Sequence, residues 1–210
     1  MHFTIDRKQL IKAIDFVSAT VAVRTTKPAI EGIKISVVRK NEANLAVLES
    51  TDLEISSQYT LPTNALLPAT EGACCVDPKQ LVQILRTREN EVVELKLTDR
   101  GLNVSTAGMD VDLQIQPAED FPSVVTDEKS KLQIEAKAFA DALKSVFCAE
   151  NKIENSGKWT TAGIYFEEIG DAIDIVATTT RVLAWSSPKI PCGVNPPQGG
   201  ITVPRKAAHV

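Results

Sequence analysis

The feature that most constrains the fold of this chain of 210 residues is an internal repeat. A valine or isoleucine is followed by an acid or a proline, and a lysine stands three positions after the aliphatic residue. The pattern occurs at residues 5–8, 76–79, 134–137 and 203–206. A repeat of this length indicates that one supersecondary unit recurs along the chain and packs against its own copies.

Each of the first three copies leads into a predicted helix. The apolar residues that follow recur at helical spacing, which predicts a helix with one buried stripe. Asp6, Asp77 and Glu135 stand at the helix starts, where an acid is favoured by the helix dipole. The predicted stripes are Leu10, Ala13, Ile14 and Val17; Leu81, Ile84 and Leu85; and Phe139, Ala142, Leu143 and Val146.

Strands are predicted on both sides of each helix. Apolar residues alternate in segments such as 33–37 and 93–97, which is typical of half-buried strands. The links between strands, such as 98–101 and 169–171, are short, so neighbouring strands pair antiparallel. The predicted fold class is therefore α+β, and a doubly wound parallel sheet is excluded.

The intervals between the four copies run long, short and long, which pairs the first copy with the second and the third with the fourth. We expect one complete domain at residues 1–124 and a second at residues 125–210, with a linker at 126–131. Few residues follow the fourth copy. The second domain is therefore expected to be cut short in its second half.

Composition places the chain among ordinary globular proteins, with 43% hydrophobic and 24% charged residues. The charged start, residues 1–8, does not resemble a signal peptide, and no apolar run is long enough for a membrane span. A cytoplasmic protein without membrane contact is expected. The net charge of -4 argues against a nucleic-acid binder unless positive charge gathers on one surface.

The four cysteines, at positions 74, 75, 148 and 192, form no C-x-x-C pair. Cys74 and Cys75 would point to opposite faces of a strand. Buried free thiols are favoured over a metal site. No metal or other cofactor is expected.

Residue types argue against an enzyme as well. His2 and His209 lie near the ends of the sequence and offer no credible general base. The pairs 52/54 and 110/112 would place two carboxylates on one face of a strand; they could bind a divalent ion, but polar strand faces are favoured. Gly199-Gly200 lacks the G-K-[ST] sequence of a phosphate loop. We expect no catalytic residue.

Several local motifs, in order along the chain, resemble the bacterial DNA sliding clamp, the beta subunit family of DNA polymerase III. They are residues 24–28, 50–54, 117–122 and 201–206. The resemblance implies the DNA-clamp fold, in which each domain is a pseudo-twofold pair of strand–helix–antiparallel-strands units with helices on the inner face. In that family, three domains per chain and two chains form a ring around duplex DNA.

The implied function is that of a non-catalytic processivity factor, which encircles duplex DNA and tethers the polymerase and other replication proteins. This chain would be an N-terminal fragment without the third domain. Because the family's dimer interface joins first and third domains, the homodimeric ring is expected of the full-length protein and not of this chain. The alternative is a stand-alone interaction protein of clamp descent, a decoy or adaptor that closes no ring.

The helices are where DNA contact is expected, through phosphates and without regard to sequence. The repeat places Lys8, Lys79 and Lys137 in one register, and the resemblance adds a loop arginine and a channel aromatic. The alternatives are that the lysines form an ordinary solvated face and that the aromatic residue opens a strand in the core. The candidate DNA-binding residues are Lys8, Lys12, Lys79, Lys137, Arg24 and Trp159.

A second site is implied by the resemblance alone. Partner peptides of the polymerase and the clamp loader bind the family's pocket at a T-D-G-H-R-L segment, whose place is taken here by residues 178–183. Thr180 replaces the glycine, so the peptide preference should differ or the pocket be closed. Ordinary turn and core roles are the alternative. The candidates are Thr178, Arg181, Val182 and Leu183.

Overall fold

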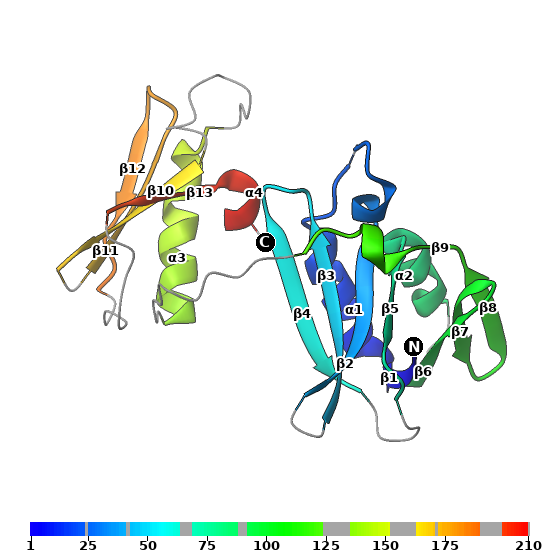
Figure 1. Cartoon of the computed structure of the whole chain (residues 1–210). Coiled ribbons are helices and arrows are strands. Elements are labelled where there is room, and N and C mark those ends of the chain that lie inside the picture. Colours follow the sequence, from blue (N-terminus) through cyan, green and yellow to red (C-terminus); the bar gives the residue numbers. More distant parts are fainter. Residues whose placement is uncertain are drawn as a thin grey trace. The chain divides into compact units, whose positions relative to one another are not determined.

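The computed structural model describes residues 1–23, 25–40, 43–63, 69–87, 92–123, 135–151, 163–170, 172–189 and 199–209. The chain divides into two compact units, Met1–Val124 and Val125–Val210 (Figure 1). Each unit is described by itself. None of the helices in the described ranges is long and apolar enough to cross a membrane.

The first unit contains two copies of one strand–helix–strands motif. The first copy comprises β1 (His2–Asp6), α1 (Arg7–Ser18), β2 (Ile33–Lys40), β3 (Ala43–Thr51) and β4 (Ser56–Pro62), with the 3-10 turn η1 (Pro28–Glu31) before β2. The second comprises β5 (Gly72–Val76), α2 (Pro78–Arg86), β6 (Val92–Thr98), β7 (Gly101–Thr106) and β8 (Met109–Leu113). The short β9 (Ile115–Gln116) and η2 (Ala118–Asp120) follow.

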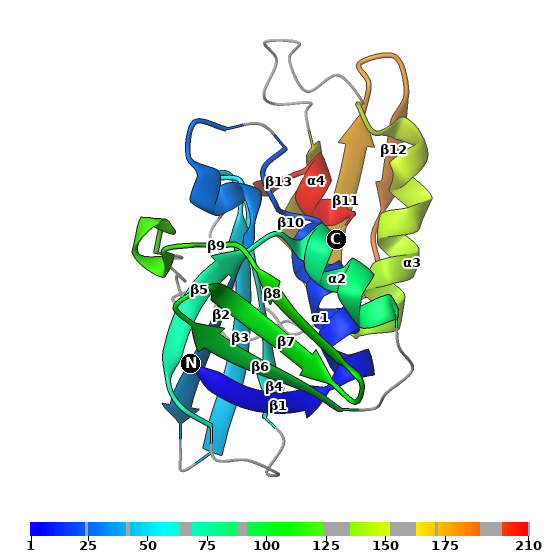
Figure 2. The ribbon, with the colours of Figure 1, turned by 90° about the vertical axis from the view of Figure 1, so that its right-hand side faces the viewer.

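The two copies exchange their first strands. One sheet has the order β4-β3-β2-β5-β9 and the other β1-β6-β7-β8, and all pairs are antiparallel. Thus β1 joins the sheet of the second copy, and β5 joins the sheet of the first. This interleaving gives the unit pseudo-twofold symmetry and a single core under α1 and α2 (Figure 2).

The helix predictions hold in detail. Leu10, Ala13, Ile14 and Val17 are buried, as are Leu81 and Leu85, and Ile84 packs against the same core. Asp6 caps α1 by accepting the backbone N–H of Gln9 at 2.8 Å, and Asp77 caps α2 by accepting that of Lys79 at 2.8 Å. Both acids therefore satisfy backbone groups that the helix leaves free.

The second unit repeats the motif on a smaller core. Its elements are α3 (Ala136–Val146), η3 (Phe147–Ala149), β10 (Gly163–Ile169), β11 (Ala172–Thr178), β12 (Leu183–Ser186), β13 (Ile201–Pro204) and α4 (Arg205–Ala208). The sheet order is β12-β11-β10-β13. Ala142 and Val146 are buried, whereas Phe139 and Leu143 are only partly buried. Glu135 occupies the N-cap of α3 but makes no capping hydrogen bond.

The same strand crossing recurs in both units. Ile33 of β2 pairs with Val76 of β5, and Ile164 of β10 pairs with Val203 of β13. The residue before each isoleucine is a glycine. A Cβ added at Gly32 would lie 2.7 Å from the carbonyl oxygen of Val76, and one at Gly163 would lie 2.3 Å from that of Val203. Both crossings therefore require glycine, a signal that the sequence reasoning missed.

Two turns are also equivalent between the units. Thr51 and Thr178 each donate a side-chain hydrogen bond to a carbonyl four residues on, at 2.9 and 2.8 Å. Each also accepts the N–H of the residue two positions on, at 3.0 Å. That residue has a left-handed backbone in both turns, with φ 78° at Leu53 and φ 73° at Thr180. A β-branched residue is rarely found in this region, so Thr180 is strained.

The carboxylate pairs serve local structure. Asp52 and Glu54 lie in the first of these turns and not on a strand, so that expectation was wrong; the Asp52 carboxylate instead accepts the backbone N–H groups of Glu54 and Ile55. Asp110 and Asp112 do lie on β8, where both accept from the side-chain amide of Asn103, at 2.5 and 2.8 Å. Within the described ranges, no group of three or more potential ligands could hold a metal ion.

The cysteines differ in exposure. Cys74 is buried in the main core, and Cys75 is buried in a separate cluster with Ala29, Ile30 and Phe121, which confirms that they face opposite ways. Cys148 is a free thiol but is exposed, so the expectation of burial was wrong there; it lies in η3, after the end of α3. Cys192 lies outside the described residues.

Alkylation of the folded protein should distinguish these thiols. Burial raises the pKa of Cys74 to about 12 and that of Cys75 to about 11. In a Cys192→Ser background at pH 8, iodoacetamide should modify Cys148 and leave the other two intact until urea unfolds the chain, as read by peptide mass spectrometry. Equal labelling of all three thiols in the folded state would contradict this assignment.

The same two thiols predict a pH dependence of stability. Because the buried thiols stay protonated where those of the unfolded chain ionise, the free energy of unfolding should fall as pH rises above 9.0, the ordinary pKa of a cysteine thiol.

Thr180→Gly should stabilise the second unit by about 0.5–1 kcal/mol. Release of left-handed strain, roughly 1–2 kcal/mol, exceeds the gain in unfolded-state freedom that glycine brings. Thr180→Ala is the matched control because it keeps the Cβ and should give no such gain. Urea unfolding measures both variants, and an alanine variant as stable as the glycine variant would show that the backbone strain is absent.

Candidate nucleic-acid interface

The candidate surface in the first unit is the solvent face of α1 and α2. Lys8 and Lys12 on α1 and Lys79 on α2 are exposed. In the second unit Lys137 is exposed on α3. Throughout the described part of the chain, no hydrogen bond or ion pair engages the amino groups of these four lysines. Their positive charges are therefore available to an anion.

The position of these lysines follows from the repeat. Lys8, Lys79 and Lys137 are each the second residue of their helix. A lysine there opposes the helix dipole, which helix stability alone would not select. In α1 and α2 a capping aspartate also occupies one backbone N–H group of this turn. An approaching phosphate would therefore be met chiefly by the lysine side chains.

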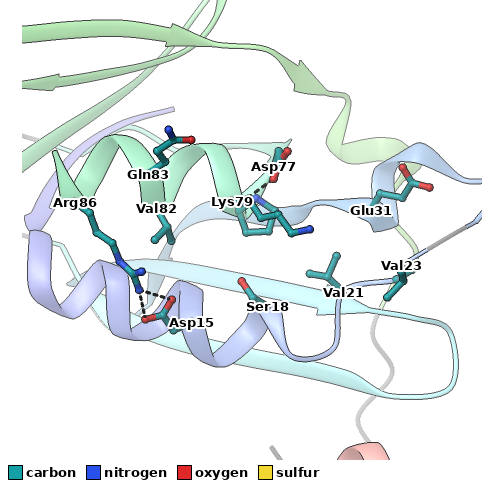
Figure 3. Close-up of a pocket in the computed structure, with 12 residues that line it drawn as sticks. Asp15, Ser18, Val21, Val23, Glu31, Asp77, Lys79, Val82, Gln83 and Arg86 are labelled. Atoms are coloured by element: carbon teal, nitrogen blue, oxygen red, sulfur yellow. Dashed lines mark hydrogen bonds and ion pairs between the residues drawn. The ribbon is translucent and has the colours of Figure 1, made fainter.

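The two arginines of these helices have structural partners. Arg7 donates to the backbone carbonyl of Leu85 at 3.1 Å, which ties the start of α1 to the end of α2. Arg86 on α2 pairs with Asp15 on α1 at 3.3 Å. The lysines are thus the free cations of this surface, while the arginines help to hold the helices side by side. Figure 3 shows the contact of Arg86 with Asp15.

A cleft of about 750 Å³ lies between α1 and α2. Val21, Ala22 and Val82 give it apolar walls, and Figure 3 shows Val82 pointing across the cleft from α2 toward α1. Its charged residues are Asp15, Glu31, Asp77, Lys79 and Arg86. Three carboxylates against two cations make the cleft itself slightly acidic. Phosphate contact is therefore expected at the exposed cationic side chains of the two helices rather than deep in the cleft.

Two candidates cannot be placed. Arg24 and Trp159 lie outside the described residues, and their roles stay predictions.

The candidate peptide segment forms the turn between β11 and β12. Thr178 and Leu183 are paired residues on these two strands, so the structure brings them together. Arg181 is exposed, and Val182 and Leu183 keep 54% and 67% of their surface exposed. An ordinary core role is therefore wrong for Leu183, whereas Thr178 does make the turn's hydrogen bonds.

Sequence reasoning missed a neighbour of this segment. Trp185 follows Leu183 by two residues on β12, so both side chains point to the same face, and it is 62% exposed. Alternation along residues 183–186 was the available signal. The two side chains form an exposed apolar pair on β12, which is an edge strand of the sheet.

Comparison with known proteins places these features in one family. The model of the DNA polymerase III beta subunit, N-terminal domain, matches residues 1–126. The chain is 30% identical over 157 residues to the beta sliding clamp of Pseudomonas putida, covering 70% of this chain and 41% of that protein. It is 27% identical over 218 residues to the beta sliding clamp of Escherichia coli K12, covering 98% and 54%.

Solved structures agree on the fold. The crystal structure of the DNA polymerase III subunit beta from Pseudomonas aeruginosa superposes with a TM-score of 0.87 at 24% identity, over 100% of this chain and 56% of that chain. The DNA polymerase sliding clamp from Bacillus subtilis gives a TM-score of 0.84 at 18% identity, over 100% and 55%.

The chain thus spans about half the length of the relatives that it matches. The strand exchange, the helix pair and these matches agree with the DNA-clamp fold, and the chain belongs to the DNA polymerase III beta subunit family.

Proposed function

We propose that this chain is the DNA-contacting part of a sliding clamp, a processivity factor that encircles duplex DNA and tethers the replicative polymerase. The observation that carries the proposal is the set of unpaired lysines at one register of the helices: Lys8, Lys79 and Lys137, with Lys12 one turn further along α1. Membership of the beta subunit family supports it. The proposed role is non-catalytic.

Charge distribution fits such a role. The whole chain carries a net charge of -4, yet the exposed crests of α1 and α2 carry free lysines. Long, flexible lysine side chains attract phosphates without reading base sequence. A few such contacts, screened by salt, hold the duplex weakly enough for movement along it. Arg24 and Trp159 would contribute further contacts to DNA.

Protein partners are proposed at the second surface. Thr178, Arg181, Val182 and Leu183 would contact short linear peptides of the polymerase and the clamp loader. Support comes from the exposure of Val182 and Leu183 and from the adjacent Trp185. The strained Thr180, in place of the family's glycine, should alter the peptide preference. A homodimeric ring and a cytoplasmic location are proposed for the full-length protein.

DNA binding tests the proposal directly. Lys8→Gln, Lys12→Gln and Lys79→Gln together should weaken binding of the chain to duplex DNA of any sequence. The slope of log K against log salt should fall by about 0.9 for each phosphate that a lysine no longer neutralises. Fluorescence anisotropy between about 50 and 200 mM salt measures both quantities.

A matched control removes the same charge from the sheets. Lys40, Lys96 and Arg100 are exposed on or between strands, and changing all three to glutamine should leave the slope unchanged. An equal effect of both triple variants would mean that net charge and not the helix face determines binding. Absence of salt-dependent binding in the parent chain would refute DNA contact by this face.

A further inference from the structure

The ion pair between Asp15 and Arg86 lies on the same helix surface as the free lysines. Arg86 is, with Lys79, one of the two cations that line the cleft. Its guanidinium contacts the Asp15 carboxylate of the neighbouring helix. We propose that Asp15 competes with DNA phosphate for Arg86 and thereby limits the affinity of this surface for DNA. The inference rests on the proposed function and names a residue that tunes it.

The geometry of the pair permits exchange. A single nitrogen of Arg86, Nη2, contacts both oxygens of Asp15, at 3.4 and 3.3 Å. Charge-assisted contacts are usually shorter, about 2.7–2.9 Å, and the strong arginine–carboxylate geometry uses two nitrogens in parallel. The side chains are 61% and 53% exposed, so water and salt screen their attraction. A phosphate can therefore compete with Asp15 for Arg86.

Displacement of Asp15 from Arg86 by a phosphate would cost free energy. When Arg86 turns to a phosphate, Asp15 loses its cationic partner and stands beside an anion of the same sign. The unfavourable interaction offsets part of the attraction between Arg86 and the phosphate. Asp15 would thus lower the contribution of Arg86 to DNA affinity, while the free lysines keep the surface attractive to DNA.

The other acids of the cleft have different partners. Glu31 accepts the backbone N–H of Thr25 at 3.3 Å, and Asp77 accepts that of Lys79 at 2.8 Å. Neither of them engages a cationic side chain in the described part of the chain. Among the cleft carboxylates, Asp15 is therefore the one whose removal would release a cation.

The internal repeat shows that the fold does not require an acid at this position. Aligning the helices on their lysines places Lys144 of α3 at the position of Asp15, and Asp141 at that of Lys12. Both helices thus carry two lysines and one acid at these three positions. In α1 the acid stands where it reaches Arg86 of α2 (Figure 3).

Asp15→Asn is the decisive variant. The 210-residue chain carrying it should bind duplex DNA more tightly than the parent, with the log–log salt slope steeper by about 0.9 because one more phosphate is neutralised. With that slope, the affinity ratio between variant and parent should change roughly threefold between about 50 and 200 mM salt. Asp99→Asn, in the β6–β7 turn, makes the same change in net charge and should leave the slope at the parent value.

A double-variant cycle identifies the cation involved. Arg86→Gln should have little effect on DNA affinity in the parent and a clear effect in the Asp15→Asn background, because the arginine is released only there. If the ion pair only stabilises the fold, Asp15→Asn will lower the urea midpoint of unfolding and leave the salt slope of DNA binding unchanged. That result would overturn the inference. If the parent itself shows no salt-dependent binding, the proposed function fails instead.

Discussion

The exchange of first strands between the two copies of the motif is the constraint on which the first unit depends. Because β1 pairs with β6 and β5 pairs with β2, neither copy can complete its own sheet. The close approach of β5 to the chain before β2 is possible only because Gly32 has no side chain beside the Val76 carbonyl. Gly163 meets the same demand beside Val203 in the second unit.

Helix placement follows from that exchange. Each helix connects a strand of one sheet to a strand of the other, so α1 and α2 come to lie side by side over a shared core. This core buries their apolar stripes, so their charged residues face the solvent. The repeat then places lysines at the same turn of each helix. A surface with recurring positive charge arises from a fold that buries the apolar face of each helix.

Charge on this surface is balanced rather than maximal. Arginines tie the helices together through the Leu85 carbonyl and the Asp15 carboxylate, while lysines stay free. A ring that slides must hold DNA by contacts that break readily, since phosphate contact carries no sequence information. Under the proposed function, the attraction of this surface for DNA is modest because its arginines are paired and only its lysines are free.

Local patterns in the sequence determined the helices, their capping acids, the antiparallel strands and the register of the lysines, because these depend on spacing and on neighbours within a few residues. Tertiary structure alone decided which copy receives each first strand, the need for Gly32 and Gly163, and the pairing of Asp15 with Arg86. Such interactions join residues far apart in the chain; Asp15 and Arg86 are separated by 71 positions. Hydrophobic periodicity cannot predict such interactions, because it indicates which face of a helix or strand is buried and not which residues lie against that face.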